Sequence, residues 1–228
     1  MKLMNTSALF FLGILLADSS ARGTAQKSIT ILDRDLAAQL DARKAEWKKP
    51  RAPVGFASGQ TARDCAAYIQ LKCSSKLNET EENDRNAAEY LACEVLEIID
   101  RATPAKSATS PQARGKALLS RLDLRTFPSS LRQRLDEKSF VLSKVKDLHA
   151  RAQENRVVAE DSDWNFVISV SAILDLDHDG TADWIVELTD EAKTATYRSY
   201  DALVIRNADH PGPLKAEPTA HFICDSAK

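Results

Sequence analysis

Four aspartates fall close together in one short stretch of this chain. Residues 175–183 read DLDHDGTAD, so carboxylates occupy positions 1, 3, 5 and 9 of the stretch, and glycine occupies position 6. Like charges at this density repel one another unless a cation lies between them. Hard oxygen ligands at alternating positions suit Ca²⁺, which takes six to eight oxygens at roughly 2.3–2.6 Å. Gly180 permits the sharp turn that such a loop needs. The spacing therefore predicts a calcium site.

The acidic loop is flanked by sequence typical of strands, whereas an ordinary EF-hand loop lies between two helices. An EF-hand also needs a glutamate at position 12 of the loop, and that position is Val186 here. Glu187 follows one residue later. Because successive strand residues point to opposite faces of a sheet, Glu187 cannot take the place of the missing ligand. The loop is therefore EF-hand-like only in its first nine positions.

The pattern strand–DxDxDGxxD–strand, from Ile173 to Val186, resembles the calcium loops of integrin-type FG-GAP and VCBS repeats. The resemblance implies a metal shell built from the side chains of Asp175, Asp177, Asp179 and Asp183 and the carbonyl of Thr181. It covers only this stretch, and a single copy does not imply a propeller, which needs several blades. The alternative is a solvated hairpin turn in which Asp-Gly serves only as turn residues. We expect a bound Ca²⁺ to be structural.

The first residues have the character of an export signal. A short basic start precedes an apolar run from Ala8 to Ala17, which is too short to span a bilayer. Small residues follow, and cleavage after Ala21 or Ala25 fits the small-x-small rule. We therefore expect a signal peptide at 1–25, and a periplasmic or secreted protein without a membrane span in the mature chain. The alternative is a buried N-terminal helix.

The chain has four cysteines, and an even number in an exported protein favours disulfide bonds. No C-x-x-C is present, which is the usual signature of a redox motif or a paired-cysteine zinc site. Residues 61–77 and 84–101 are typical of two helices joined by a polar turn, and position 65 of such an antiparallel hairpin lies opposite position 93. We therefore predict the pairs Cys65–Cys93 and Cys73–Cys224. The next alternative is Cys73–Cys93.

The period of the apolar residues changes along the chain. Helical spacing predicts helices over 33–48, 61–77, 84–101, 115–123 and 131–153, with a linker at 102–113. Beyond residue 160 the period becomes two, and strands are expected at 164–174, 184–188 and 197–206, with a short fourth strand at 220–224. The predicted class is α+β, with a helical region at 26–155 and an antiparallel β region at 156–228 that carries the acidic loop.

The net charge and the motifs of the sequence restrict the classes of function that we consider. The net charge is −2, and the clustered basic surface of a nucleic-acid-binding protein is not indicated. The sequence contains no P-loop, no G-x-S-x-G elbow and no H-E-x-x-H motif. We therefore favour a calcium-stabilised binding protein without catalytic activity. One specific form is an inhibitor or immunity-type protein whose partner is an envelope protein or enzyme. The alternative is an envelope hydrolase, or another enzyme in which calcium is structural.

Overall fold

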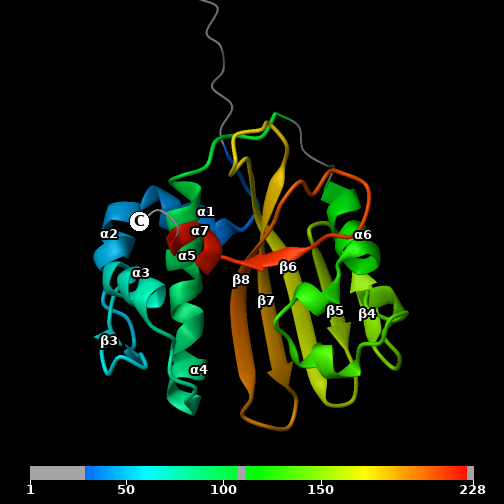
Figure 1. Ribbon diagram of the computed structural model, residues 1–228, viewed down its shortest axis with the longest axis horizontal. Coiled ribbons are helices and arrows are strands. Elements are labelled where there is room, and N and C mark those ends of the chain that lie inside the picture. The colour runs from blue at the N-terminus through cyan, green and yellow to red at the C-terminus, as the bar shows by residue number, and fades with distance from the viewer. Residues whose placement is uncertain (1–28, 107–110, 225–228) are drawn as a thin grey trace, which may run out of the picture.

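The protein is described by a computed structural model that covers residues 29–106 and 111–224. The predicted signal peptide lies outside these residues. A seven-stranded antiparallel sheet occupies the centre, with the strand order β4-β5-β6-β7-β8-β9 (Figure 1). Strand β1 pairs with β6 beyond the end of β5. The strands are β1 (Thr30–Ile31), β4 (His149–Ala152), β5 (Arg156–Glu160), β6 (Trp164–Leu174), β7 (Asp183–Ala192), β8 (Arg198–Ile205) and β9 (Ala216–Pro218).

Helices and short turns make up most of the remainder. The α-helices are α1 (Arg34–Asp41), α2 (Arg43–Lys48), α3 (Cys65–Ser74), α4 (Glu81–Ala87), α5 (Leu91–Ile99), α6 (Pro111–Arg121) and α7 (Ala220–Cys224). The 3₁₀ turns are η1 (Ala88–Tyr90), η2 (Leu124–Thr126), η3 (Ser130–Arg134) and η4 (Leu142–Lys144). A two-stranded ladder, β2 (Val54–Gly55) and β3 (Thr61–Ala62), lies beside α3. No helix within the described residues is long and apolar enough to cross a membrane.

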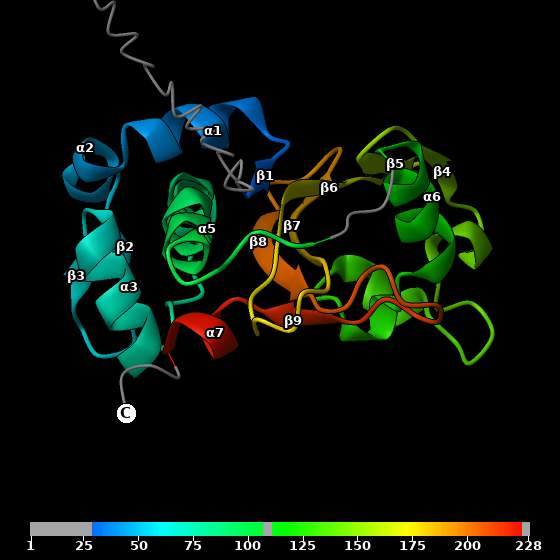
Figure 2. The same cartoon turned by 90° about the horizontal axis from the view of Figure 1, so that it is seen from above.

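The sheet is covered on both faces, because successive strand residues point to opposite sides. Trp184 and Leu203 belong to a core that includes α6, whereas Ile185 and Val204 belong to a second core with α1, α5 and α7. Figure 2 shows the three layers from above, with α5 and α7 on one side of the sheet and α6 on the other. The predicted α+β class is thus confirmed. The helices of the first half pack against the antiparallel strands of the second.

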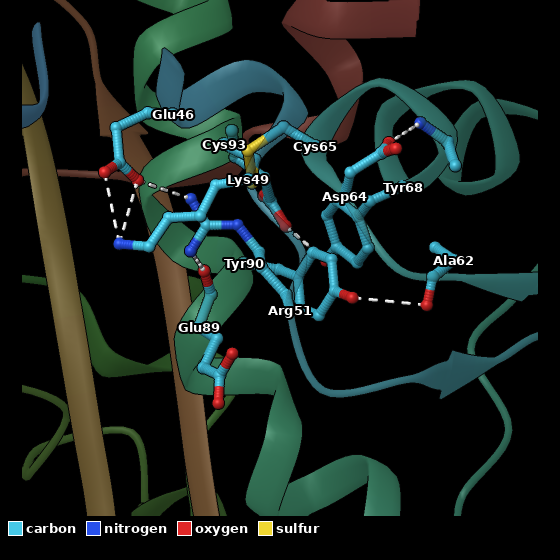
Figure 3. The surroundings of a disulfide bond; sticks show 12 residues. Glu46, Lys49, Arg51, Ala62, Asp64, Cys65, Tyr68, Glu89, Tyr90 and Cys93 are labelled. Carbon is cyan, nitrogen blue, oxygen red and sulfur yellow. Dashed lines mark hydrogen bonds and ion pairs between the residues drawn. A yellow bond between two sulfur atoms is a disulfide. The ribbon is translucent and has the colours of Figure 1, made fainter. Parts of the chain in front are cut away.

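A third core lies within the helical part and surrounds the first disulfide. Cys65 at the start of α3 is bonded to Cys93 in α5, with Cα atoms 5.2 Å apart (Figure 3). Beside it, the rings of Tyr68 and Tyr90 stack with centroids 4.6 Å apart. The Tyr90 hydroxyl lies 2.7 Å from the carbonyl oxygen of Ala52, to which it donates a hydrogen bond. The Cys65–Cys93 pair agrees with the prediction from the helical hairpin.

The second disulfide joins Cys73, near the end of α3, to Cys224 at the end of α7. Arg101 reinforces this attachment, since its guanidinium donates to the carbonyl oxygens of Phe222 and Ile223 at 2.9 and 3.1 Å. The C-terminal segment is thereby fastened to the helical part, as predicted. Two disulfides fit an oxidising compartment.

Several predicted elements differ in the structure. The helix expected over 131–153 is absent from that stretch, which holds η3, η4 and strand β4. Asp136 ends the helical pattern, because its carboxylate accepts hydrogen bonds from the backbone N–H groups of Lys138 and Ser139 at 2.7 Å each. The strand expected at 220–224 is helix α7, and the last strand is β9 instead. A short apolar run does not distinguish the two.

The other predicted helices are present with altered bounds. The segment 33–48 is divided at Ala42 into α1 and α2. Thr61 begins β3 rather than a helix, and the side chain of Asp64 caps α3. The segment expected as one helix over 84–101 consists of α4, η1 and α5. Residues from both sides of the predicted boundary at 155/156 enter the sheet, since β1 and β4 precede it.

Candidate metal site

The acidic loop joins β6 to β7 at one end of the sheet. Leu174 and Asp183 are the last paired residues, so both strands end together and residues 175–182 form a wide connection between them (Figure 1). Two residues of the loop adopt left-handed backbone conformations, His178 with φ 64° and Gly180 with φ 91°. These conformations fold the loop back on itself, so that its N–H groups meet its own carboxylates.

Asp175 is the most constrained residue of the loop. Its side chain is buried, and its Oδ2 accepts a hydrogen bond from the N–H of Gly180 at 2.7 Å. Its Oδ1 is also buried, yet no group in the described part of the chain donates a hydrogen bond to this oxygen. A buried polar atom left without a partner costs about 1–3 kcal/mol, and more when it carries charge. An oxygen in this position is suited to a cation.

Asp183 faces the same point from the start of β7. Its side chain is only 1% exposed. Its Oδ2 accepts from the N–H of Leu176 at 2.8 Å, and its Oδ1 accepts from the N–H of Asn207 at 2.9 Å. Burial raises the pKa of Asp183, and the neighbouring carboxylates of Asp177 and Asp175 raise it further. The N–H groups of Leu176 and Asn207 act in the opposite direction.

Three aspartates converge on one point. Asp175, Asp177 and Asp183 each place a carboxylate oxygen within 4.8 Å of the other two. Two of the three side chains are buried, and Asp177 lies at the exposed rim. This spacing lets a single ion contact all three oxygens. The acidic cluster can therefore hold a metal ion.

Asp179, which the family resemblance also places among the ligands, lies outside this group. Its side chain is exposed, and its Oδ1 accepts a hydrogen bond from the N–H of Thr181 at 2.6 Å. This bond lowers the pKa of Asp179. His178 is exposed as well, and its Nδ1 lies 3.1 Å from the hydroxyl of Thr103.

Two distant segments hold the loop in place, and no local pattern in the sequence pointed to either. After α5, Thr103 forms a two-residue bridge with Asp175, and the N–H of Lys106 donates to the carbonyl of Gly180 at 3.1 Å. After β8, the N–H of Ala208 donates to the carbonyl of Ala182 at 2.9 Å. The site is thus assembled from three parts of the chain.

Comparisons with protein-family models, with curated proteins and with solved structures found no match to this chain. The resemblance to FG-GAP and VCBS loops therefore rests on the residues of the acidic loop alone.

Proposed function

We propose that this protein binds Ca²⁺ through Asp175, Asp177 and Asp183 and that the ion stabilises the fold. The observation that carries the proposal is the buried Oδ1 of Asp175, which has no hydrogen-bond donor and belongs to a carboxylate that converges with two others. A cation at this point offsets both the lost hydrogen bond and the repulsion among the three charges.

The donor set favours calcium over other metals. All three side chains offer carboxylate oxygen, which suits hard cations, whereas zinc and copper sites draw on imidazole and thiolate. The four cysteines are engaged in disulfides, and the exposed His178 contacts Thr103. A wide loop adapts to the six to eight ligands of Ca²⁺, whereas Mg²⁺ demands near-octahedral geometry. The carbonyl of Thr181 and water are available to complete the shell.

Calcium in this loop acts as a structural ion. The loop contacts the segments that contain Thr103 and Asn207, so an ion bound to it stabilises three parts of the chain together. Such binding adds about 2.7 kcal/mol of stability when free calcium exceeds the dissociation constant a hundredfold.

We further propose that the protein is exported to the periplasm or secreted, and that it binds a protein partner rather than catalysing a reaction. Two disulfides support the location. The sequence contains no P-loop, no G-x-S-x-G elbow and no H-E-x-x-H motif, which supports the binding role. A buried ionisable cluster in the helical part is structural. There Glu94 accepts hydrogen bonds from Tyr68 at 2.7 Å and from Lys72, and burial raises the pKa of Tyr68 well above its usual value. These contacts hold α3 against α5.

An inhibitor or immunity-type role against an envelope enzyme is the specific form that we favour. Affinity capture from the envelope fraction, with calcium or with chelator, tests it. The expected result is one stoichiometric enzyme that is retained by the calcium-loaded protein and loses activity on binding. Turnover of envelope polymers or model esters by the protein itself would instead establish an enzyme.

Calcium binding is tested by calorimetry on the chelator-treated protein. We expect one Ca²⁺ per chain, weaker binding of Mg²⁺, and a rise in melting temperature on adding calcium. Asp175→Asn is expected to abolish the heat of binding. Asp179→Asn is the matched control, because it changes an exposed carboxylate of the same loop that lies outside the cluster. Absence of heat and of any change in melting temperature in the unaltered protein would refute the site.

A further inference from the structure

A hollow lies at the end of the sheet that is opposite the acidic loop. Trp164, at its edge, is the first residue of β6 and pairs with Ala192, the last residue of β7. Leu174, at the other end of β6, leads into the acidic loop. At about 3.3 Å per residue, this strand separates the two sites by roughly 30 Å. The hollow has a volume of about 730 Å³, and we name it the Trp164–Tyr197 hollow.

Two aromatic side chains form one wall of the hollow. The ring of Trp164 packs on Phe166 and meets Tyr197 edge-on, with centroids 5.2 Å apart. Tyr197 is 42% exposed, and among the large apolar side chains in the described residues it alone is classed as exposed. Core residues already cover the remainder of the sheet face on this side. Aromatic rings that line a hollow attract a cation through the ring quadrupole.

Two acidic side chains line the hollow. Among the described residues of its lining, Glu79 and Asp201 carry a carboxyl group and none carries a basic group. Beneath its wall, the fully buried Asp190 accepts hydrogen bonds from the N–H and hydroxyl of Ser130 at 2.7 and 3.1 Å. The carboxylate of Asp201 accepts from the hydroxyl of Ser199 at 3.0 Å. The lining of the hollow thus combines the carboxyl groups of Glu79 and Asp201 with the rings of Trp164 and Tyr197.

The neighbours of Asp201 strengthen this electrostatic character. Burial raises the pKa of Asp201, and the carboxylates of Glu94 and Asp190 add to the shift. The ammonium of Lys72 acts in the opposite direction, but it is bonded to Glu94. A cation placed in the hollow would lie close to aromatic faces and to a carboxylate that is partly removed from water. Both interactions are stronger there than on an open surface.

We propose that the Trp164–Tyr197 hollow receives an arginine side chain inserted by a protein partner. This inference rests on the binding role proposed above and names the chemistry of the partner. Arginine fits better than lysine, because its planar guanidinium stacks on an aromatic ring while it forms two parallel hydrogen bonds to a carboxylate. The volume of about 730 Å³ holds the side chain together with adjoining backbone. Arginine is also enriched among the residues that dominate binding energy at interfaces.

The test is a nuclear magnetic resonance titration of the full chain with the capped peptide Ac-Gly-Ser-Arg-Ser-Gly-NH₂. The reporter is the indole N–H of Trp164, identified by its loss in Trp164→Phe. We expect a saturable shift with a dissociation constant of about 1 mM. The same peptide with glutamine in place of arginine is the matched ligand control and is expected to give no saturable shift.

Substitutions in the hollow test whether the arginine peptide binds there. Asp201→Asn and Tyr197→Ala are each expected to lower the affinity for the arginine peptide about fivefold or more. The melting temperature is used to confirm that each variant folds. Glu82→Gln is the control, because it removes an exposed carboxylate on α4 that does not line the hollow. Equal shifts by the arginine and glutamine peptides, no shift with either, or full binding by Asp201→Asn would overturn the inference.

Two further measurements separate this inference from its alternatives. A neutral N-acetylglucosamine trimer that shifts Trp164 when the arginine peptide does not would overturn the inference in favour of a glycan ligand. Calcium titration of Asp201→Asn is expected to match the unaltered protein, and Asp175→Asn is expected to bind the arginine peptide normally. In the unaltered protein, calcium binding without peptide binding contradicts only the hollow, whereas peptide binding without calcium binding contradicts only the metal site.

Discussion

Thr103 and Asp175 exchange two backbone hydrogen bonds, of 2.9 and 2.7 Å, although 72 residues separate them in sequence. The bridge connects the segment after α5 with the first aspartate of the acidic loop. The loop therefore belongs both to the hairpin of β6 and β7 and to the attachment of the helical part. Any change in the charge of the loop is expected to affect the stability of the whole molecule.

The charge of Asp175 has opposite effects with and without calcium. In chelator, Asp175→Asn is expected to raise the free energy of unfolding by about 1 kcal/mol, because it removes a buried charge and places an amide donor beside two carboxylates. On addition of calcium, the free energy of unfolding of the variant is expected to stay unchanged, whereas that of the unaltered protein is expected to rise. Denaturant unfolding under both conditions measures this. Equal calcium stabilisation of the two proteins would contradict it.

Lys106 places a competing positive charge at the loop. Its side chain lies against Gly180, where an added Cβ would come within 2.8 Å of its Nζ, and its charge lowers the pKa of Asp179. Lys106→Met is therefore expected to raise calcium affinity, by roughly twofold to fivefold at low salt and by less at high salt. Lys116→Met, an exposed lysine on α6, serves as the control in the same calorimetric titration. Unchanged or weaker affinity for Lys106→Met would show that Lys106 does not compete with the ion.

The sequence supported the elements whose signals are local. Alternating apolar residues placed β6 correctly at 164–174, and the turn between two helices led to Cys65–Cys93 and hence to Cys73–Cys224. These predictions succeeded because residue spacing within one or two elements decides them. The helix expected over 131–153 failed because side-chain hydrogen bonds at Asp136 compete with helical ones, which apolar spacing does not reveal.

The site followed from the sequence only in part. The spacing of the aspartates indicated the cluster, and Asp175, Asp177 and Asp183 converge. Asp179 is instead turned to the N–H of Thr181, a choice that depends on the conformation of the loop. The contacts from Thr103 join residues distant in sequence, so no local motif predicts them.

Alanine substitutions at two glycines with similar backbone conformations compare the cost of backbone strain with the cost of a steric contact. Gly180 has φ 91° and lies against Lys106, whereas Gly59 has φ 81° and no atom within 4 Å of an added Cβ. Gly59→Ala is therefore expected to cost about 1–2 kcal/mol from backbone strain alone. Gly180→Ala is expected to cost a similar amount, because its Cβ would meet only the far end of the flexible Lys106 side chain, which can move aside. A markedly larger loss of unfolding free energy for Gly180→Ala, relieved by Lys106→Ala in the same chain, would show that the Lys106 side chain is held in place.

The two disulfides are expected to contribute unequally to the free energy of unfolding. The sequence separation is 28 residues for Cys65–Cys93 and 151 residues for Cys73–Cys224. Loop-closure entropy then gives about 3.6 and about 5 kcal/mol, respectively. Double replacement of each pair by alanine, followed by denaturant unfolding, compares them. A larger loss for the pair Cys65–Cys93 would show that the packing around this buried disulfide outweighs chain entropy.

Tyr90 is expected to make the stability of the protein sensitive to alkaline pH. Burial raises the pKa of its phenol to about 12, while Arg51 acts in the opposite direction. The single proton of the phenol is shared between the carbonyl oxygens of Ala52 and Ala62, which lie 2.7 and 3.2 Å from the hydroxyl oxygen, so the phenol must stay protonated in the folded state.

Because the folded pKa of Tyr90 exceeds the unfolded value of about 10, the resulting stability is fully present below pH 10 and is lost as the pH rises towards 12. Tyr90→Phe is expected to be about 1 kcal/mol less stable at neutral pH, from the lost hydrogen bonds. The gap between the two proteins should narrow between pH 10 and 12 in denaturant unfolding. Other tyrosines and the lysines titrate in both proteins and cancel, so a gap that stays constant across this range would exclude a buried, protonated Tyr90 phenol as its source.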